Sequence, residues 1–315
     1  MSSLVSLGLT LALFMAEAAG QKITSSANQA AVDASYPYYL GWDYAPYERG
    51  ALINEILRSA HDITTDDMVR MQADVLDIRA RAILPRLIEI IRESASTGAE
   101  KQSAEELEGW NFEARAAVVA PTIFNEFWDE LNRLTWDDEW GEATGWMAWP
   151  ASQVMIDIVL NEAGAAWFDD NATPGRESLV DVAQNAFRSA VAKLEKKLGP
   201  WGDAWRWGKA KGTELRHLAG IPGFSRGIEA DGVSHVINAI DAAAGPSWRM
   251  VVELGAEVRA WGNYPGGQSG NPGSKFYDDR VSDWAAGRSY ELVFLKSPEE
   301  PNPRIVSRAV MRGAR

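Results

Sequence analysis

The chain contains no cysteine and only three histidines. Without cysteine it cannot form disulfide bonds, bind zinc through thiolates or use a cysteine nucleophile, and this absence alone identifies no cellular compartment. The histidines, His61, His217 and His235, follow none of the HxxH or HExxH spacings that are typical of metal centres. The sequence therefore favours no histidine-based metal site, and each histidine is predicted to be a surface residue or a hydrogen-bonded polar residue.

Basic residues are scarce relative to acidic ones. The 31 Lys and Arg residues stand against 44 Asp and Glu residues, which gives a formal net charge of −13 and a pI of about 4.8. Affinity for nucleic acids and for anionic lipid surfaces comes from clustered Lys and Arg. We therefore expect no nucleic-acid partner.

The apolar run at the amino end, residues 4–15, is shorter than the roughly 20 residues of a membrane span, so no membrane span is expected. Ala16-Glu17-Ala18 follows it and resembles a signal-peptide cleavage site, although Met1-Ser2-Ser3 lacks the usual basic residue. Residues 1–19 are predicted to be either a signal-like leader, which would direct the protein to the periplasm or outside the cell, or a misassigned start.

The rest of the chain divides by pattern at about residue 218. Residues 23–27 are predicted to form a strand, and a Tyr-rich loop follows. Apolar residues then recur with helical spacing, and a capping box at Thr64 and Asp67 and a stop at Gly199-Pro200 mark two helix ends. The predicted helices start at Arg49, run from Thr64 to a kink or end at Pro85 with a continuation to residue 91, and cover residues 121–131, 153–162 and 178–198. Residues 45–218 are thus predicted to form a mainly helical lobe.

After Gly220 the pattern changes to short strands separated by glycines. Residues 247–254 alternate in character, which predicts a strand with one face packed more deeply than the other. Residues 290–295 are apolar on both faces, as expected of a strand inside a layered fold. Residues 306–311 are predicted to form a final edge strand. We call residues 220–315 the strand region.

Residues 262–290 contain six glycines and two prolines around a short polar core, Gln268, Ser269 and Asn271. Glycines at this density allow positive φ and close approach of neighbouring groups, which favours an ordered loop, although turns between strands would use the same residues. The order GGQSGNPGSxxYDDxxxxWxxGRxxxL resembles the carboxy-terminal signature of the penicillin acylase family of N-terminal-nucleophile hydrolases.

A second segment near the amino end resembles the same family. It consists of Ala27-Asn28-Gln29, then Tyr36-Pro37, then Arg49 before a helix. Weaker matches lie between the two segments, at residues 107–111, 167–170 and 205–208. The resemblance implies that Asn28 donates to the oxyanion hole and that Arg49 orients Asn28 and the substrate. From spacing alone, Asn28 would be a turn or cap residue and Arg49 part of a surface ion pair.

The resemblance implies a fold and an activity. The fold is α+β: a partial αββα N-terminal-nucleophile hydrolase sandwich with a large, mainly helical lobe, formed by residues 20–315. The activity is hydrolysis of carbon–nitrogen bonds in linear amides with an apolar acyl group, linked to β-lactam antibiotic metabolism. The strands from the two ends of the chain are expected to join in a single β-layer that frames one pocket.

The family's nucleophile is a Ser that self-cleavage exposes as a new amino terminus, far upstream of the Asn. Only 27 residues precede Asn28 here, so the chain is expected to be a fragment that lacks the nucleophile and is inactive alone. The expected partners are a small amide substrate and the missing amino-terminal segments or small subunit. At the family's calcium position near Leu40 no carboxylate is present, so no cofactor or metal is expected.

A rival hypothesis is a non-enzymatic carbohydrate-binding module. It rests on the 14 Trp residues and on the acidic, Trp-rich segment at residues 136–149. Aromatic platforms flanked by carboxylates can bind sugars, whereas Trp residues with helical spacing more often lie in a core. A row of coplanar exposed rings would favour this hypothesis.

Overall fold

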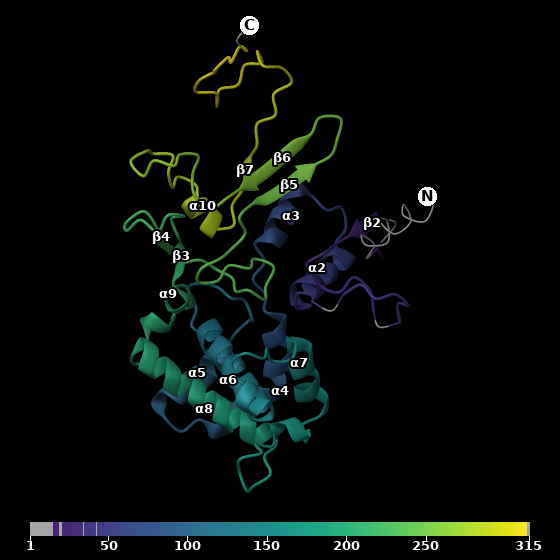
Figure 1. Cartoon of the computed structure of the whole chain (residues 1–315), viewed down its shortest axis with the longest axis vertical. Coiled ribbons are helices and arrows are strands. Elements are labelled where there is room, and N and C mark those ends of the chain that lie inside the picture. Colours follow the sequence, from purple (N-terminus) through teal and green to yellow (C-terminus); the bar gives the residue numbers. More distant parts are fainter. Residues whose placement is uncertain (1–14, 19–20, 34, 42, 314–315) are drawn as a thin grey trace.

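A computed structural model describes residues 15–18, 21–33, 35–41 and 43–313 (Figure 1). Most of the leader predicted at residues 1–19 lies outside the described residues. Figure 1 shows helices α4 to α8 gathered at one end of the molecule and the sheet of β5, β6 and β7 towards the other. The mixture of helices and strands agrees with the predicted α+β class.

The first helices begin where side chains cap their free backbone N–H groups. The predicted capping box at Thr64 and Asp67 is confirmed. The helix it starts ends at Gln72 and does not continue to Pro85, because Asp77 accepts from the N–H groups of Arg79 and Ala80 and starts a new helix. These helices are α2 (Glu48–Ser59), α3 (Thr65–Gln72), α4 (Ile78–Ser94) and α5 (Gly98–Glu108).

Pro85 lies inside α4 and does not end it. Proline removes one helical hydrogen bond, but the neighbouring side chains of Leu84 and Leu87 are buried in the core and offset that loss. The pattern also gave no prediction of α5. Its buried positions include Ser103 and Ala104, which are too small and too polar to produce a clear apolar stripe.

Helices α6 and α8 form the centre of the helical lobe. Pro121 lies in the first turn of α6, where its missing N–H has no helical partner in any case, and Gly199 ends α8 with a φ of +84°. The rings of Phe127 on α6 and Phe187 on α8 meet edge to face, with centroids 6.3 Å apart, and both are fully buried. The remaining helices of the lobe are α7 (Ser152–Asn161) and α9 (Trp207–Lys211), beside α6 (Ala120–Trp140), α8 (Leu179–Leu198) and the 3-10 helices Gly141–Ala143, Ala166–Phe168 and Asp203–Trp205.

The described strands form three separate antiparallel sheets. They pair as β1 (Met15–Ala18) with β2 (Gln21–Thr24), β3 (Thr213–Leu215) with β4 (Arg226–Ile228), and β5 (Arg249–Glu253) with β6 (Arg259–Asn263) and β7 (Tyr290–Glu291); the short helix α10 (Val281–Ala285) precedes β7. The prediction that the strands of the two chain ends join in one β-layer is therefore wrong. The amino-terminal strand pairs with its own hairpin arm, and the outer edge of β5 is occupied by α3, where Gln72 Nε2 donates to the carbonyl of Met250 over 2.9 Å.

Two strand predictions fail in length. Residues 306–311 form no strand, and β7 covers only two of the six residues predicted at 290–295. Short strands without neighbours on both edges have few ladder hydrogen bonds to hold them. The division of the chain at about residue 218 into a helical lobe and a sheet-forming segment stays a prediction. None of the helices among the described residues has the length and apolar character needed to cross a membrane.

Candidate active site around Asn28 and Arg49

Asn28 and Arg49, 21 residues apart in the chain, lie in direct contact. Arg49 is the second residue of α2, and its Nη2 donates to the side-chain oxygen Oδ1 of Asn28 over 3.2 Å and to the carbonyl of Ala27 over 3.1 Å. The structure thus brings together the two site residues that the sequence predicted. Their chemical roles stay predictions.

The contact determines which end of the Asn28 amide is available. A guanidinium group only donates hydrogen bonds, so the amide oxygen must face Arg49 and the amide NH2 must face away from it. Asn28 is exposed, and among the described residues its Nδ2 has no hydrogen-bond acceptor. The pair therefore presents a neutral, oriented N–H donor at the protein surface.

The backbone also holds Asn28 in place. Its φ is +66°, in the left-handed region that Asn tolerates better than most residues. Its carbonyl accepts from the N–H of Ala45 over 2.9 Å, which closes the Tyr-rich loop onto the segment. The strained conformation is consistent with a residue whose side chain must point in a set direction.

Neighbouring side chains fasten this segment to α2, and sequence reasoning missed them. Gln29 Oε1 accepts from the N–H of Ala27 over 2.7 Å, and Ser25 Oγ donates to Asn54 Oδ1 over 2.8 Å. A Cβ on Gly50 would lie 2.7 Å from the end of the Gln29 side chain, so any other residue there would require Gln29 to move. The sequence around Gly50 gave no indication of this contact.

A buried carboxylate, Glu48, underlies the site. Its Oε1 accepts from Ser152 Oγ on α7 and lies 3.9 Å from Nδ1 of His235. Burial raises the pKa of Tyr47 to about 12, and burial lowers the pKa of His235 to about 4. Sequence reasoning missed Glu48. Its place in the first turn of α2 was a signal that could have identified it, because carboxylates stabilise the amino ends of helices.

Between β6 and α10, residues 264–280 of the glycine-rich segment form a loop that is held by backbone hydrogen bonds. The N–H of Arg280 donates to the carbonyl of Gly266 over 2.9 Å, and the N–H of Ser269 donates to the carbonyl of Phe276 over 3.0 Å. A Cβ on Gly267 would lie 2.0 Å from the Phe276 carbonyl oxygen, so this position requires glycine. Tyr277 anchors the loop through its hydroxyl, which donates to the carbonyl of Phe224 over 2.8 Å.

The two matched segments do not frame one pocket in this structure. Figure 1 places α2 and β2 on one side of the β5–β7 sheet and α10 and β4 on the other. The glycine-rich loop instead lines a cavity of about 200 Å³ together with His217, Arg226 and other residues near β3 and β4. The expectation of a shared pocket is wrong for the same reason as the shared layer, since no described sheet joins the two ends.

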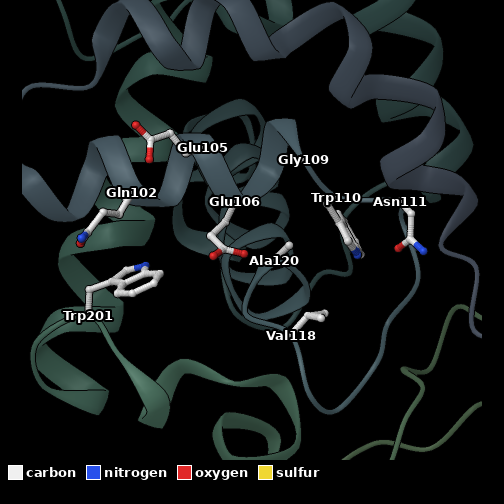
Figure 2. Close-up of a pocket in the computed structure, with 9 residues that line it drawn as sticks. All are labelled: Gln102, Glu105, Glu106, Gly109, Trp110, Asn111, Val118, Ala120 and Trp201. Carbon is white, nitrogen blue, oxygen red and sulfur yellow. The ribbon is translucent and has the colours of Figure 1, made fainter.

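A larger cavity, of about 710 Å³, lies in the helical lobe (Figure 2). Its polar groups include the carboxylates of Glu105 and Glu106, beside the ring of Trp201. Two carboxylates would repel the oxyanion that forms during amide hydrolysis, and the residues that line the cavity include no Ser, Thr, Lys or His to act as nucleophile or base. Size alone does not make this cavity the better candidate, and the Asn28 site is favoured on chemistry.

The Trp-rich segment provides no coplanar platform around Trp136. Trp136 is buried, its ring is tilted by 54° from that of Trp167, and Trp149 donates its indole N–H to Asp137 over 2.9 Å. Of the tryptophans in the segment, only Trp146 and Trp149 are exposed. The rings around Trp136 therefore do not form the coplanar exposed row that would favour the carbohydrate-binding hypothesis.

Calcium is not supported by the residues present. Within the described ranges, no three His, Asp or Glu side chains are placed to hold a metal ion. The position near Leu40 also has no carboxylate. These residues do not fit the calcium site that the family resemblance implies, and the absence of a cofactor stays a prediction.

Comparisons with known proteins identify similar chains. The model of the penicillin amidase family matches residues 15–300. The acyl-homoserine lactone acylase QuiP of Pseudomonas aeruginosa is 24% identical over 85% of this chain and 37% of its own length, and the QuiP of Pseudomonas syringae pv. tomato is 23% identical over 84% and 36%. Penicillin G acylase from Alcaligenes faecalis has a similar fold, with a TM-score of 0.55 and 14% identity over 93% of this chain and 57% of its own. The chain thus spans little more than a third of the length of these curated relatives.

Proposed function

The chain belongs to the penicillin amidase family, and we propose that it forms the oxyanion-stabilising part of an acylase that cleaves the carbon–nitrogen bond of linear amides. The observation that supports this role is the Arg49–Asn28 contact, which turns the amide NH2 of Asn28 outward. The names of the relatives, acyl-homoserine lactone acylase and penicillin G acylase, support amides with an apolar acyl group as substrates and a link to β-lactam metabolism.

The proposed chemistry follows from the tetrahedral intermediate. A hydroxyl nucleophile adds to the carbon of the amide carbonyl and loses its proton to a base. The carbonyl oxygen becomes an anion in this step. Asn28 Nδ2 donates to that anion, and the positive charge of Arg49 lies close behind the amide. The carbon–nitrogen bond then breaks, and the amine leaves with the transferred proton. Water then hydrolyses the ester that remains on the nucleophile, which releases the acid and restores the hydroxyl. Loss of one such donor costs about 3 kcal/mol of transition-state stabilisation.

The nucleophile in this proposal is a serine that becomes an amino terminus by self-cleavage of a precursor. Its α-amine, with an ordinary pKa of roughly 7.7 to 8.0, can accept the hydroxyl proton near neutral pH. We infer that this serine belongs to polypeptide that residues 1–315 do not include, and that the complete enzyme works in the periplasm or outside the cell. Residues 1–315 alone are then inactive.

The test compares two polypeptides: residues 1–315, and the longest product that the gene's genomic reading frame encodes. Each is incubated with a phenylacetyl anilide and with a long-chain acyl-homoserine lactone, and amine release is measured. We expect turnover only by the longer product, and a 10²- to 10³-fold lower kcat in its Asn28→Ala variant.

Asn302→Ala serves as the matched control, because Asn302 lies in the carboxy-terminal tail and its Oδ1 accepts only from the nearby N–H of Arg304. Its kcat should be unchanged, and the thermal midpoints of both variants should match that of the parent. Turnover by residues 1–315 alone would refute the proposed division of labour, and an unchanged kcat for Asn28→Ala would refute the role of Asn28.

A further inference from the structure

The first turn of α2 contains a buried carboxylate that the proposed chemistry does not use. Glu48 directly precedes Arg49 and is only 1% exposed. Its Oε1 accepts from Ser152 Oγ, whereas its Oε2 has no hydrogen-bond donor in the part of the chain that the structure describes. A buried oxygen without a donor costs free energy, because its lost hydration is not replaced. Stability of the fold alone therefore does not explain Glu48.

Glu130 shows how this chain compensates a buried carboxylate elsewhere. It is also 1% exposed, but side chains of α6 and α8 donate to both of its oxygens. The basic neighbour of Glu48 is His235, whose Nδ1 lies 3.9 Å from Oε1. Its imidazole is neutral at pH 7, because burial lowers the pKa of His235 to about 4. Within the described ranges, Glu48 thus has a hydroxyl donor but no cation beside it.

Glu48 lies where the amino ends of two helices meet. It is the first residue of α2, and Ser152 is the first residue of α7. The residues before them, Tyr47 and Ala151, form no side-chain cap. The partial positive charge at the amino end of a helix stabilises a carboxylate placed there. The contact between Glu48 and Ser152 therefore fastens together two helix starts that lack ordinary caps.

Fixing the first turn of α2 also fixes Arg49. Adjacent side chains on a helix point in different directions, so Glu48 reaches α7 while Arg49 reaches Asn28. The buried apolar side chains of α2, Leu52 and Leu57, both lie after its first turn. In an active site, a displacement of about 1 Å can lower a rate by about 100-fold. The direction of the Asn28 amide thus depends on a turn that Glu48 holds in place.

We propose that Glu48 is a positioning residue of the acylase: its contact with Ser152 keeps Arg49 in place, and Arg49 keeps the amide N–H groups of Asn28 directed outward. The inference rests on the proposed function. Glu48 acts through Arg49 and does not touch the substrate. Its loss should therefore lower kcat and leave KM nearly unchanged, because the oxyanion exists only along the reaction path and not in the bound substrate.

The test is a double-mutant cycle in the longest product of the reading frame, with the phenylacetyl anilide as substrate. Glu48→Ala should lower kcat at least about tenfold and change KM less than about twofold. In the Asn28→Ala background the same change should lower kcat less than about twofold, because the donor that Glu48 positions is already absent. A residue that only supports the fold would lower kcat by the same factor in both backgrounds.

Ser152 provides a second, milder variant, because its side chain is half-buried. Ser152→Ala removes the donor and should lower kcat at least about threefold, whereas Ser152→Thr keeps the hydroxyl and should retain the parent kcat. If Glu48→Ala does not fold, the cycle with Ser152→Ala decides. Glu130→Ala is the matched control, because Glu130 also accepts from a serine, Ser189, but lies on α6. It should lower the thermal midpoint and leave the kcat of the folded enzyme unchanged.

Hydrogen exchange in residues 1–315 tests the anchor independently of activity. The N–H groups of Ala45 and Ala51 donate to the carbonyls of Asn28 and Tyr47. Glu48→Ala should speed the exchange of a peptide that covers residues 45–54 at least about fivefold, because the first turn of α2 opens more often. Glu130→Ala should leave the exchange of this peptide unchanged.

The outcomes separate this inference from the proposed function. If Asn28→Ala lowers kcat as expected, then an unchanged kcat for Glu48→Ala and Ser152→Ala, equal losses in both backgrounds, or unchanged exchange would overturn the positioning role alone. A longer product that hydrolyses no amide, or hydrolyses it without Asn28, would refute the function. Faster exchange would then make Glu48 a structural anchor only, which also overturns the positioning role.

Discussion

The helical lobe and the strand region differ in what they bury. In the lobe, α6 and α8 enclose aromatic and aliphatic side chains, and the buried carboxylate of Glu130 is matched by Arg133, Lys193 and Ser189. In the strand region, the largest sheet buries Arg249 and leaves Met250 and Val252 exposed. The lobe therefore has one large hydrophobic core, whereas the strand region combines small apolar clusters, such as that of Ala230, Ile240 and Trp284, with buried polar contacts.

The difference shows in the ionisable groups of each region. Hydrogen bonds from Arg133, Lys193 and Ser189 outweigh burial and lower the pKa of Glu130 to about 2. In the strand region, burial lowers the pKa of Arg249 to about 10. The charged form of Glu130 is therefore stabilised in the lobe and that of Arg249 is destabilised in the strand region, so mutations at these two groups should have different effects.

Phe127→Ala should have the largest effect, because it opens a cavity in the complete core. The ring is fully buried against Phe187, and truncation of such a side chain costs about 3–5 kcal/mol of unfolding free energy. Urea denaturation followed by circular dichroism measures the loss. Val180→Ala, on the exposed side of α8, is the control and should change stability by less than about 0.5 kcal/mol. Similar losses of unfolding free energy for both variants would contradict a tightly packed hydrophobic core around Phe127.

Arg249→Met tests whether polar contacts hold the strand region. The change leaves Asn238 Oδ1 and the carbonyl of Trp284 without this donor, and buried groups left unpaired cost about 2–3 kcal/mol in total. Arg259→Met is the matched control, since Arg259 also lies over a tryptophan, Trp261, but is exposed. Its cost should stay below about 1 kcal/mol. Denaturation curves that rank the two variants in the opposite order would contradict the comparison.

The sequence predicted the lobe better than the strand region, and the reason is physical. Helices such as α8 carry their whole signal locally, in an apolar stripe with Ser178 before it and Gly199 after it. A strand such as β5 shows only that its two faces differ. Which face is buried depends on distant residues, Trp284 and Asn238.

The candidate site shows the same limit. The pairing of Asn28 with Arg49 came from the family resemblance, because an Asn before a loop and an Arg at a helix start have ordinary structural roles. The supporting contacts of Gln29 with Gly50 and of Glu48 with Ser152 depend on how three segments pack. The expected meeting of the two chain ends failed because strand pairing across more than 200 residues leaves no local signal.

As the pH falls, the protein should lose stability through His235 at a higher pH than through Glu130. The folded-state pKa of His235 is about 4, below the ordinary 6.5, because burial and the charges of Arg79 and Arg49 disfavour the imidazolium. The unfolded chain therefore binds more protons between pH 6.5 and 4, and stability is lost as the pH falls through that range, by about 1–2 kcal/mol at pH 5. The corresponding loss for Glu130 lies lower, between about pH 4.5 and 2.

Urea denaturation at pH 7, 6 and 5 measures this loss. His235→Gln should flatten the curve between pH 7 and 5, because a neutral amide does not titrate. His61→Gln, at an exposed histidine, should leave the parent curve unchanged. A parent protein equally stable at pH 7 and pH 5 would show that His235 is not disfavoured as a cation in the folded state.

The smallest effect is expected at two adjacent residues of β5, and their contrast sharpens the comparison most. Val→Thr keeps the β-branched shape and adds one hydroxyl group. At Val252, which is 38% exposed, water solvates that hydroxyl, so the unfolding free energy of residues 1–315 should change by less than about 0.5 kcal/mol.

At Val251, only 8% exposed beside Arg249, the same hydroxyl is desolvated and should cost about 1–2 kcal/mol. Equal costs at the two positions in residues 1–315 would mean that both faces of β5 are already buried.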